Sequence, residues 1–535
     1  MNATPNTTSV FVVGGGPIGL ATAVLLHRFA IPAVVVEKSP TTTDHPKSRG
    51  CFSRTMELFR QWGVEDAIRR RGLPIGSDIW VCAKSLVGEE LGRTTPEPNL
   101  GHTPSWKSMV AQDAVEEELL AAVRNSPYVR VLFSTEMTSL EESEDGVQVT
   151  TRCLETGTES VWRARFLVAA DGAASDVRQA VGIAMEGPAS IAVMSNDYWR
   201  CDLSHISRLA DVAGCRIFSD VPGIPASMIL NTDGHDRWLT VTQIGNGASR
   251  VEPPSLDATL SMIRHQVGIP DLPVQMINRS VWRVSRQVAR NFRSKSVFLT
   301  GDAAHRFPPT GGYGLNSGVQ DAHNLVWKLA FVLKGWAGER LLESYDQERR
   351  PVAHSNADFS MGNRKRMETM ERAMRSGDGD WKRFWIRDLD NHLHSIGQQL
   401  GFYYQSDAVI PDGTAAVPVT PRTYVPSDRP GSRFPHYWLD PERTRSTLEW
   451  FDTEFTLVTS PLGTPWLEAV RDHAERSAIR IVPRMLEGHH FTDALQMGLK
   501  GAVLVRPDGH VAWRIPYAPS DPLRELSTAV DELLA

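Results

Sequence analysis

A glycine-rich turn near the N-terminus restricts the possible folds of this chain more than any other feature. The segment Gly14–Gly19 reads G-G-G-P-I-G and satisfies the pattern G-x-G-x-x-G. It follows an apolar, β-branched run over Ser9–Val13 and opens Pro17–Phe29, which has the composition of a helix. A second β-branched run follows at Ala33–Glu37. The chain therefore begins with a βαβ unit, which requires a parallel sheet with a right-handed crossover.

The residues of this turn indicate a ligand as well as a fold. Glycines at these positions permit a tight turn, the close approach of a pyrophosphate and dense helix–strand packing, while the helix N-terminus offers N–H groups to phosphates. Glu37 lies 18 residues after Gly19, at the end of the second strand, where an acid can bind a ribose hydroxyl. Turn, helix and acid together predict a dinucleotide-binding site, although the same pattern serves both NAD and FAD.

The rest of the chain alternates between helical and strand patterns. We expect helices at Ser53–Arg71 and Asp113–Asn125, hairpin strands over 128–170, and an antiparallel sheet within 187–290. A strand at Ser296–Leu299 and a helix at Gly318–Lys334 restore the α/β pattern, so the first domain is expected to be discontinuous.

The last third of the chain is expected to hold a charged helical stretch and then a separate small domain. The helical stretch begins at Tyr345 and reaches about residue 400, and a Pro- and Thr-rich linker covers 410–435. Strands are expected at Phe455–Thr459, Ile479–Val482 and Ala502–Val505.

Two further motifs follow apolar strands. One is an Asp-Gly turn at Asp171-Gly172, followed by Arg178. The other places Gly301-Asp302 after a strand and continues through the glycine-rich segment 308–316 into a helix. An acid at such a strand end can bind a polyol hydroxyl, and the helix N-terminus favours negative charge on an adjacent ring.

These three motifs resemble the fingerprints of the single-component (class A) FAD aromatic hydroxylases, which include para-hydroxybenzoate, phenol and polyketide hydroxylases. The match is densest from Gly301 to Asn316 and at Asp321, and it covers residues 9 to about 360. The resemblance implies an α/β fold: a Rossmann-like FAD-binding domain, an inserted antiparallel-sheet substrate domain and a thioredoxin-like C-terminal domain without C-x-x-C. The expected boundaries are 1–180 and 291–400 for the FAD-binding parts, the latter with the helical segment, 181–290 for the middle domain and 410–535 for the C-terminal domain.

The resemblance also implies the residues of the cofactor site. Glu37 would hold the adenosine ribose and Asp302 the ribityl chain, and Gln112 would contact the ribityl or phosphate portion. Asp171 and Arg178 would support the pyrophosphate region and the Asp-Gly turn, and Leu315 and Asn316 would offer backbone N–H groups to the flavin pyrimidine edge. The expected cofactor-binding set is Gly14, Gly16, Pro17, Gly19, Glu37, Lys47, Arg49, Gln112, Asp171, Arg178, Gly301, Asp302, Pro309, Gly312, Gly314, Leu315 and Asn316.

Lys47 and Arg49 in that set are alternatives for one basic position. Relatives carry an arginine after the second strand, whereas here Lys47 stands at that place and Arg49 two residues later. Arg49 is slightly favoured for this role. Pro309 is expected beside the flavin face, with its carbonyl available to substrate, and is the one residue assigned to catalysis.

The reaction implied by the resemblance is hydroxylation of a phenolic or polyketide-like ring. NADH or NADPH reduces FAD while visiting transiently, O₂ forms a flavin 4a-hydroperoxide, and its distal OH is transferred to the small aromatic substrate. A group that favours phenol deprotonation is expected among Tyr198, Arg216 and His235, with no choice between them, and His305 is expected to be structural. A Baeyer–Villiger or epoxidising oxygenase on the same scaffold, or a non-catalytic flavin-fold binding protein, are the alternatives.

Composition excludes several other classes. The net charge of −6 and pI near 6.3 offer no general attraction to nucleic acid or anionic lipid. The uncharged, mostly apolar run Phe11–Leu26 is too short and too glycine-rich to cross a membrane. Five scattered cysteines without C-x-x-C indicate a reducing, cytoplasmic setting, and no spacing predicts a metal site. Because no cysteine follows Cys215, the C-terminal domain cannot exchange thiols and is expected to be structural or to form a homodimer contact.

Overall fold

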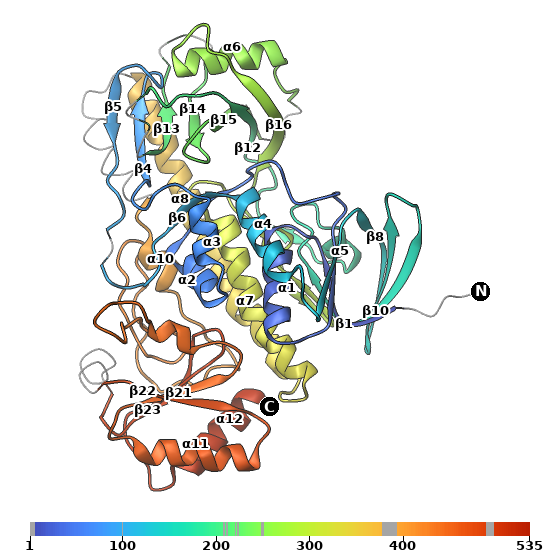
Figure 1. The fold of residues 1–535 in the computed structure, drawn as a ribbon, viewed down its shortest axis with the longest axis vertical. Coiled ribbons are helices and arrows are strands. Elements are labelled where there is room, and N and C mark those ends of the chain that lie inside the picture. Colours follow the sequence, from blue (N-terminus) through green and yellow to red (C-terminus); the bar gives the residue numbers. More distant parts are fainter. Residues whose placement is uncertain are drawn as a thin grey trace.

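The computed structural model describes residues 6–98, 100–206, 209, 212–219, 221, 224–247, 251–376, 393–487 and 497–535. Three sheets follow one another along the long axis of the molecule, as Figure 1 shows, with two long helices, α7 (Tyr313–Leu333) and α8 (Arg340–Ser376), running between them. The order of the sheets along this axis does not follow the sequence, because the segment after the middle sheet returns to the central one.

The central sheet is built from the first motif-bearing segments of the chain. Its main path has the order β18-β19-β10-β1-β2-β7, in which β19, β10, β1, β2 and β7 run parallel. A hairpin of β8 and β9 extends β10. The strands are β1 (Asn6–Val13), β2 (Ala33–Val36), β7 (Val129–Leu132), β8 (Thr135–Ser143), β9 (Gly146–Cys153), β10 (Glu159–Ala169), β18 (Arg293–Ser294) and β19 (Val297–Leu299).

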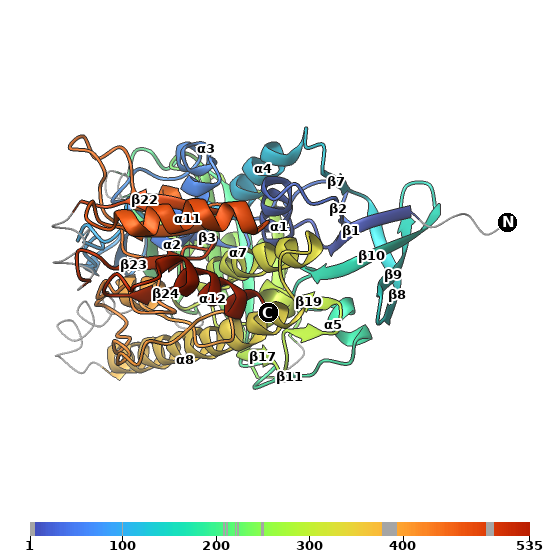
Figure 2. The ribbon, with the colours of Figure 1, turned by 90° about the horizontal axis from the view of Figure 1, so that it is seen from below.

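Helices cover this sheet and explain why its central strands are apolar throughout. Residues Val10–Val13 and Ala33–Val36 are all buried, the pattern of parallel strands with both faces covered. The helices of this part are α1 (Pro17–Arg28), α2 (Ser53–Gln61), α3 (Glu65–Arg70), α4 (Gln112–Val123) and α5 (Asp176–Ala180). Figure 2 shows α1, α4 and α7 beside the central strands. The helix expected over Ser53–Arg71 is two helices, because Gly63 turns the chain between them at φ +77°.

The middle sheet has the order β16-β12-β15-β14-β13-β4-β5. It is antiparallel except for the parallel pair β4 and β13. Its strands are β4 (Ile79–Ala83), β5 (Glu90–Arg93), β12 (Ala192–Arg200), β13 (Val212–Ile217), β14 (Ser227–Asn231), β15 (Arg237–Asn246) and β16 (Gln275–Val284). The structure therefore differs from the expected division at residue 180, because β4 and β5 come from the first segment and complete one edge of this sheet.

The two faces of the middle sheet have different neighbours. Helix α6 (Leu256–Val267) covers one face, where Ile263 and Val267 pack on a core with Trp199 and Trp238. The opposite face carries a second apolar cluster that includes Tyr198, Leu230, Trp80 and Trp282. We call this opposite face, made by Trp80, Tyr198, Arg216, Met228, Leu230, Leu239, Val241, Gln243 and Trp282, the inner face.

The third sheet forms the C-terminal part. It has the order β22-β21-β23-β24, with β21 and β22 parallel and the other pairs antiparallel. Its elements are β21 (Phe455–Thr459), α11 (Thr464–Arg476), β22 (Ile481–Met485), β23 (Ala502–Val505), β24 (Val511–Ile515) and α12 (Pro522–Leu534). A parallel β-α-β unit followed by a hairpin and a helix is the order expected of a thioredoxin-like domain. The strands expected at Phe455–Thr459 and Ala502–Val505 are confirmed to the residue.

Short elements complete the fold. Two small sheets contain β3 (Arg49–Cys51) with β6 (Ser108–Ala111), and β11 (Met185–Glu186) with β17 (Gln287–Ala289) and β20 (His305–Arg306). Single turns lie at Gly301–Ala303, Ile396–Leu400 (α10) and Thr447–Trp450. The helical stretch expected from Tyr345 to about residue 400 begins earlier, at Arg340, and is helical to Ser376; residues 377–392 lie outside the described part.

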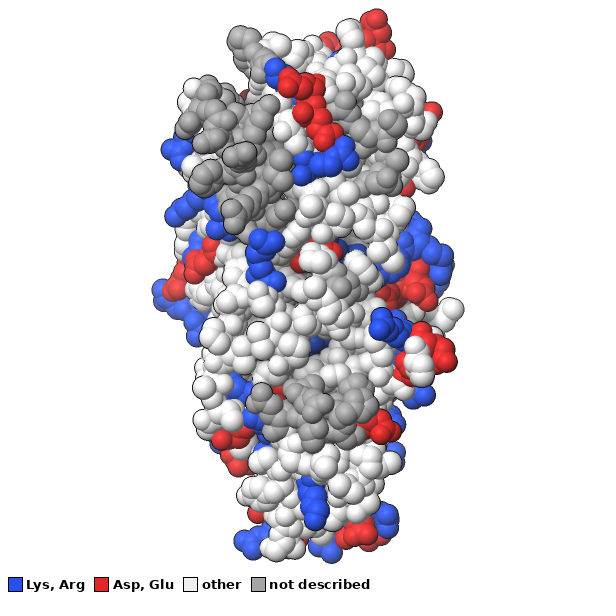
Figure 3. All heavy atoms as spheres, turned by 90° about the vertical axis from the view of Figure 1, so that its left-hand side faces the viewer, with Lys and Arg blue, Asp and Glu red and all other residues white. Residues whose placement is uncertain are grey.

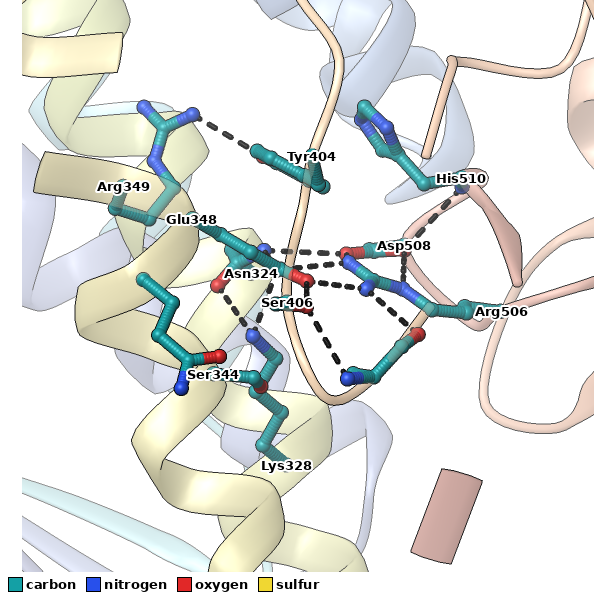
Figure 4. Close-up of polar contacts among 12 residues, drawn as sticks. Asn324, Lys328, Ser344, Glu348, Arg349, Tyr404, Ser406, Arg506, Asp508 and His510 are labelled. Atoms are coloured by element: carbon teal, nitrogen blue, oxygen red, sulfur yellow. Dashed lines mark hydrogen bonds and ion pairs between the residues drawn. The ribbon is translucent and has the colours of Figure 1, made fainter. Parts of the chain in front are cut away.

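A buried polar network joins the C-terminal part to α7 and α8 (Figure 4). The hairpin between β23 and β24, residues 506–510, inserts Arg506 and Asp508 against Glu348 of α8 and Asn324 of α7. Lys328 donates to Glu348 at 2.8 Å, and all of these side chains are almost fully buried. We call the set Asn324, Lys328, Glu348, Arg506 and Asp508 the junction network.

On the face shown in Figure 3, acidic and basic side chains are interspersed without an extended region of one sign. Within the described ranges, no helix has the length and apolar character to cross a bilayer.

Candidate functional site

The motif residues meet because they follow neighbouring parallel strands. Gly14 follows β1, Glu37 follows β2, Asp171 follows β10 and Asp302 follows β19, and these four strands are adjacent in the order β19-β10-β1-β2. The carboxyl ends of parallel strands lie at one edge of a sheet, where doubly wound α/β proteins bind their ligands. The structure thus brings the three sequence motifs and Glu37 to a single edge.

The three glycines of the first motif have separate reasons for being glycine. Gly14 has φ +104°, and a Cβ there would lie 2.3 Å from the carbonyl oxygen of Ala170; a Cβ on Gly19 would lie 1.8 Å from the Gly14 oxygen. These two glycines permit close packing of the turn. Gly16 has ordinary extended torsions, and a Cβ there would meet no described atom within 4 Å. Its missing side chain leaves open space directly at the N-terminus of α1, with Pro17 as the first helical residue.

Glu37 ties this turn to the second strand. Its carboxylate accepts hydrogen bonds from the backbone N–H of Gly15 at 2.7 Å and of Ser39 at 2.9 Å. Lone pairs remain for a hydroxyl group, as its expected contact with a ribose requires.

Asp302 lies open to solvent beside basic groups. Surrounding protein raises the pKa of its carboxyl, while the charges of His305, Arg306 and Lys47 oppose that rise. The residue is nevertheless exposed, so its carboxylate is free to accept hydroxyl groups from a ligand. Arg306, which is absent from the predicted cofactor-binding set, also has a buried Nε without a hydrogen-bond partner among the described residues. Its position directly after His305 in the third motif was the available signal.

The Gly301-Asp302 turn is held from behind by Asp321 of α7. The Asp321 carboxylate accepts from Gly301 N at 3.1 Å and from Arg349 Nε at 2.8 Å, and pairs with His305 Nε2 at 2.6 Å. Burial opposes ionisation of Asp321, but His305 and Arg349 outweigh it and lower its pKa. His305 is fully buried and stacks on Phe307, which agrees with the structural role expected for it. Arg349 was missed because its partner lies on another helix.

The glycine-rich segment 309–316 leads into α7, which begins at Tyr313, five residues before the expected start. Gly311 and Gly312 adopt φ +117° and +76°, a turn that favours glycine. The early N–H groups of a helix have no partner within it, so those of Gly314 and Leu315 face outward with the positive end of the helix dipole. Pro309 is exposed, and its carbonyl accepts from Gly312 N at 3.1 Å.

Asn316 fixes this segment to the neighbouring strand β3. Its side-chain oxygen accepts from Phe52 N and from the Thr55 hydroxyl, while its amide donates to the oxygens of Gly50 and Gly312. The Asn316 side chain therefore positions the segment, and Leu315 is the residue whose helix-terminal N–H would be offered to the cofactor.

The structure separates the two basic candidates after β2. Lys47 is exposed and its charge acts on Asp302. Arg49 points the other way: its guanidinium donates to the backbone oxygens of Ala213 and Asn231 in the middle sheet and lies over the Trp80 ring at 5.8 Å. The geometry therefore favours Lys47 at the edge that carries Asp302, in contrast to the slight sequence-based preference for Arg49.

Three other predicted residues support the backbone of the site. Gln112 is buried, and its side-chain amide donates to the Glu116 carboxylate at 2.8 Å, while its backbone N–H donates to the oxygen of Ser48, next to Lys47. Asp171 accepts from Val177 N at 3.0 Å, and its second oxygen is buried without a partner among the described residues. Arg178 donates to the Ile183 carbonyl at 2.9 Å. Asp171 thus ties the Asp-Gly turn to the start of α5, whereas the Arg178 side chain holds the segment that follows α5. Their support of the pyrophosphate region stays a prediction.

The three candidates for a phenol-activating group have different environments. His235 is exposed in the turn between β14 and β15, outside the strands that form the inner face. Tyr198 and Arg216 both lie on the inner face, and burial raises the pKa of the Tyr198 hydroxyl. The position of His235 therefore disfavours it.

This edge fits an FAD molecule on observations of the chain itself. Open space at Gly16 faces a free helix N-terminus, an exposed carboxylate lies beside two cations, and a second helix N-terminus begins at Tyr313. Gly16 with the α1 N-terminus would hold the pyrophosphate, Glu37 the ribose, Asp302 the ribityl chain, and Leu315 the flavin pyrimidine edge.

Comparison with known proteins identifies the family of this chain. The family model described as an FAD binding domain matches residues 7–360, and the model described as the C-terminal part of aromatic-ring hydroxylases matches residues 427–535. The chain therefore belongs to the FAD-dependent aromatic-ring hydroxylases, a family of monooxygenases.

Individual relatives align over nearly the whole chain. Tetracenomycin A2 monooxygenase-dioxygenase of Streptomyces glaucescens is 34% identical over 98% of this chain and 96% of its own. Phenol 2-monooxygenase of a Pseudomonas strain is 30% identical, covering 97% and 92%. The flavin-dependent monooxygenase PieE, solved with FAD and substrate, superposes with a TM-score of 0.89 at 29% identity over 99% and 100% of the two chains. Aklavinone-11 hydroxylase, solved with FAD and aklavinone, gives 0.84 at 28% identity over 99% and 100%.

Replacing Asp302 by alanine is expected to weaken FAD binding tenfold to a hundredfold, because a hydrogen bond from a hydroxyl to a carboxylate contributes about 1.5–3 kcal/mol. FAD bound per chain, measured by absorbance during dialysis, checks this. Asp358→Ala on α8, whose carboxylate is 70% exposed and pairs with Arg286, is the matched control and should retain FAD. Full flavin retention by the Asp302 variant would remove the role given to this carboxylate.

Proposed function

We propose that this enzyme hydroxylates a phenolic ring of an extended, polyketide-like aromatic substrate bound between segment 309–316 and the inner face of the middle sheet. NADH or NADPH would be the transient electron donor and O₂ the second substrate. Bound FAD supplies the redox and oxygen-activating chemistry, and the chain's residues hold the reactants and exclude water.

The observation that carries this proposal is the orientation of the inner face. Trp80, Met228, Leu230, Val241 and Trp282 present an apolar, partly aromatic surface. Contacts on this side come from the FAD-binding part: Arg49 reaches Ala213 and Asn231, and His45 contacts Ser280 and lies edge-on to Tyr198. The aromatic surface thus faces the sheet edge that fits FAD, whereas α6 covers the other face.

The chain's own groups would assist the reaction in two ways. The N-terminus of α7 places partial positive charge at the pyrimidine edge, where reduction adds negative charge. Pro309, exposed at the turn before α7, would place the reacting ring, and its carbonyl keeps a second lone pair for a substrate hydroxyl.

Other expectations extend this proposal. The free thiols of the described cysteines fit a reducing cytoplasm. The homodimer stays a prediction. The domain boundaries also stay a prediction, with β4 and β5 assigned to the middle domain.

The test is oxidation of NADH or NADPH by the holoenzyme across a panel of phenols, hydroxybenzoates and polycyclic phenols, with H₂O₂ measured in parallel. We expect one polycyclic phenol to accelerate flavin reduction and to yield a product with one oxygen from isotopically labelled O₂. NMR of the product separates ring hydroxylation from epoxidation or lactone formation. Acceleration by small phenols alone, or a lactone product, would contradict the proposal.

A further inference from the structure

Two arginines approach each other between the inner face and α8. Arg216 belongs to β13 and Arg364 to α8, and their side chains are only 12% and 11% exposed. Burial lowers the pKa of Arg216, and the nearby charge of Arg364 lowers it further. Two cations therefore lie close together in a largely desolvated place, which is unfavourable unless negative charge balances them.

The described residues neutralise the positive charge of Arg216 only in part. Its ion pair with Glu371 spans 3.7 Å, longer than a hydrogen bond, and its Nε is buried without a hydrogen-bond partner in the described part of the chain. The Phe218 ring lies 5.2 Å from the guanidinium carbon. A guanidinium has five N–H donors, so Arg216 retains donors for a further acceptor.

The acids of this region lie farther out than the arginines. Glu371 is 27% exposed, and Glu368, which pairs with Arg364 at 2.8 Å, is 51% exposed. Water therefore screens both carboxylates more than the two guanidinium groups. Arg364 also donates to Gln243 of β15 at 3.3 Å, which holds it against the inner face.

The arginine pair lies within reach of the segment that fits the flavin. The Thr310 hydroxyl donates to the Ser360 oxygen of α8 at 2.7 Å, and Arg364 follows about one helical turn later. Arg216 lies opposite Met228 in the sheet register and so shares the inner face with Trp80. An extended ring system lying along this face from Pro309 would bring its far end to the two arginines.

We propose that Arg216, assisted by Arg364, binds a carboxylate or an ionised enol at the end of the substrate distant from the ring that is hydroxylated. This assignment rests on the proposed function, whose substrate class it makes more specific. Arginine forms paired hydrogen bonds with a carboxylate, and Phe218 holds the guanidinium plane in place. The pair thus selects anionic substrates over neutral ones of the same shape.

The test compares two dihydroxyanthraquinones, rhein and danthron, which differ only by a carboxylate. Binding to the oxidised holoenzyme is measured by calorimetry without NADH or NADPH. We expect rhein to bind about tenfold tighter than danthron, the gain from one charge-assisted hydrogen-bonded pair. Arg216→Gln should bring this ratio to within about twofold of unity while danthron binds as before, and Arg364→Gln should reduce it partly.

Controls separate charge recognition from structural damage. Arg216→Lys keeps the charge and should retain part of the preference. Arg200→Gln at the end of β12, with a side chain 49% exposed, should retain all of it. The proposal would be overturned if Arg216→Gln left the ratio of rhein to danthron affinity unchanged. It would also be overturned if the wild type bound both compounds equally or bound neither. If Arg216→Gln does not retain FAD, the test rests on the ratio of rhein to danthron affinity in Arg364→Gln. A ratio equal to that of the wild type would then overturn the proposal.

The binding test and the oxygenation test fail independently. A preference for rhein that depends on Arg216 would establish the anion site even if no panel compound is hydroxylated. Hydroxylation of a neutral phenol without such a preference would support the proposed function and exclude the anion site.

Discussion

Replacing Glu348 by glutamine is expected to destabilise the folded protein by about 3–5 kcal/mol, the cost of removing one partner from a buried ion pair. Glu348 accepts hydrogen bonds from Lys328 at 2.8 Å and from Arg506 at 2.6 and 3.0 Å, and it is 1% exposed. The amide has nearly the same shape but no charge, so two buried cations would share Asp508 alone among the acids of the junction network. Denaturant unfolding followed by far-UV circular dichroism measures the loss.

The same helix offers a matched control. Glu343 pairs with Arg293 at 2.6 Å, but its side chain is 58% exposed. Exposed pairs contribute little, so Glu343→Gln should stay within about 1 kcal/mol of the wild type. Equal losses in the two variants would show that burial of the junction network does not determine its contribution.

The free energy of unfolding should depend on the same interaction at acid pH. Burial opposes ionisation of Glu348, yet Arg506 and Lys328 lower its pKa from 4.5 to about 2. Because the folded-state pKa lies below the unfolded one, the stabilisation is complete above about pH 4.5 and is lost as the pH falls towards 2. The difference corresponds to about 3 kcal/mol, in agreement with the mutational expectation. Glu348→Gln should lack this part of the acid dependence.

Replacing Gly16 by threonine is expected to produce a folded protein that binds FAD at least a hundredfold more weakly, about 3 kcal/mol. Gly16 is the N-cap of α1, a position where threonine is well accepted, and a Cβ there meets no described atom within 4 Å. The added atoms would instead occupy the space where a pyrophosphate approaches the helix N-terminus. FAD content and the unfolding temperature of the apoprotein are the two measurements.

Threonine at Gly14 provides the contrast. That residue has φ +104°, and a Cβ would lie 2.3 Å from the Ala170 oxygen, so the turn itself must distort. Gly14→Thr should lower the stability of the apoprotein as well as FAD content, whereas Gly16→Thr should lower FAD content alone. A normal FAD content in Gly16→Thr would contradict the assignment of the pyrophosphate site to this position.

The parts of the fold that could be predicted from sequence carry local signals. The parallel strands of the central sheet are short apolar runs next to glycine turns, and β21 and β23 were predicted to the residue. The strand-end residues Glu37, Asp171 and Asp302 could be placed together because parallel strands share an edge. Such inferences need only the pattern around each residue.

The features that could not be predicted from sequence depend on pairing between distant segments. Nothing near Ile79–Ala83 indicates that β4 lies beside β13, because its partner is chosen by tertiary packing. The direction of Arg49 depends on carbonyl groups of Ala213 and Asn231, which belong to the middle sheet. Lys328 and Asp321 did give a weak signal, since a charged residue within an apolar helix requires a buried partner, but the sequence does not identify Glu348 or Arg349 as that partner.

The junction network also constrains the order in which the chain can mature during synthesis. Arg506 is 158 residues beyond Glu348, so at cellular translation rates it leaves the ribosome roughly 8–30 seconds later. Until then Glu348 and Lys328 lack Arg506 and Asp508, so their charged groups stay exposed to water. The flavin-binding half is therefore expected to reach its final packing only after residues 506–508 have emerged, and a fragment truncated before the β23–β24 hairpin should not reach it.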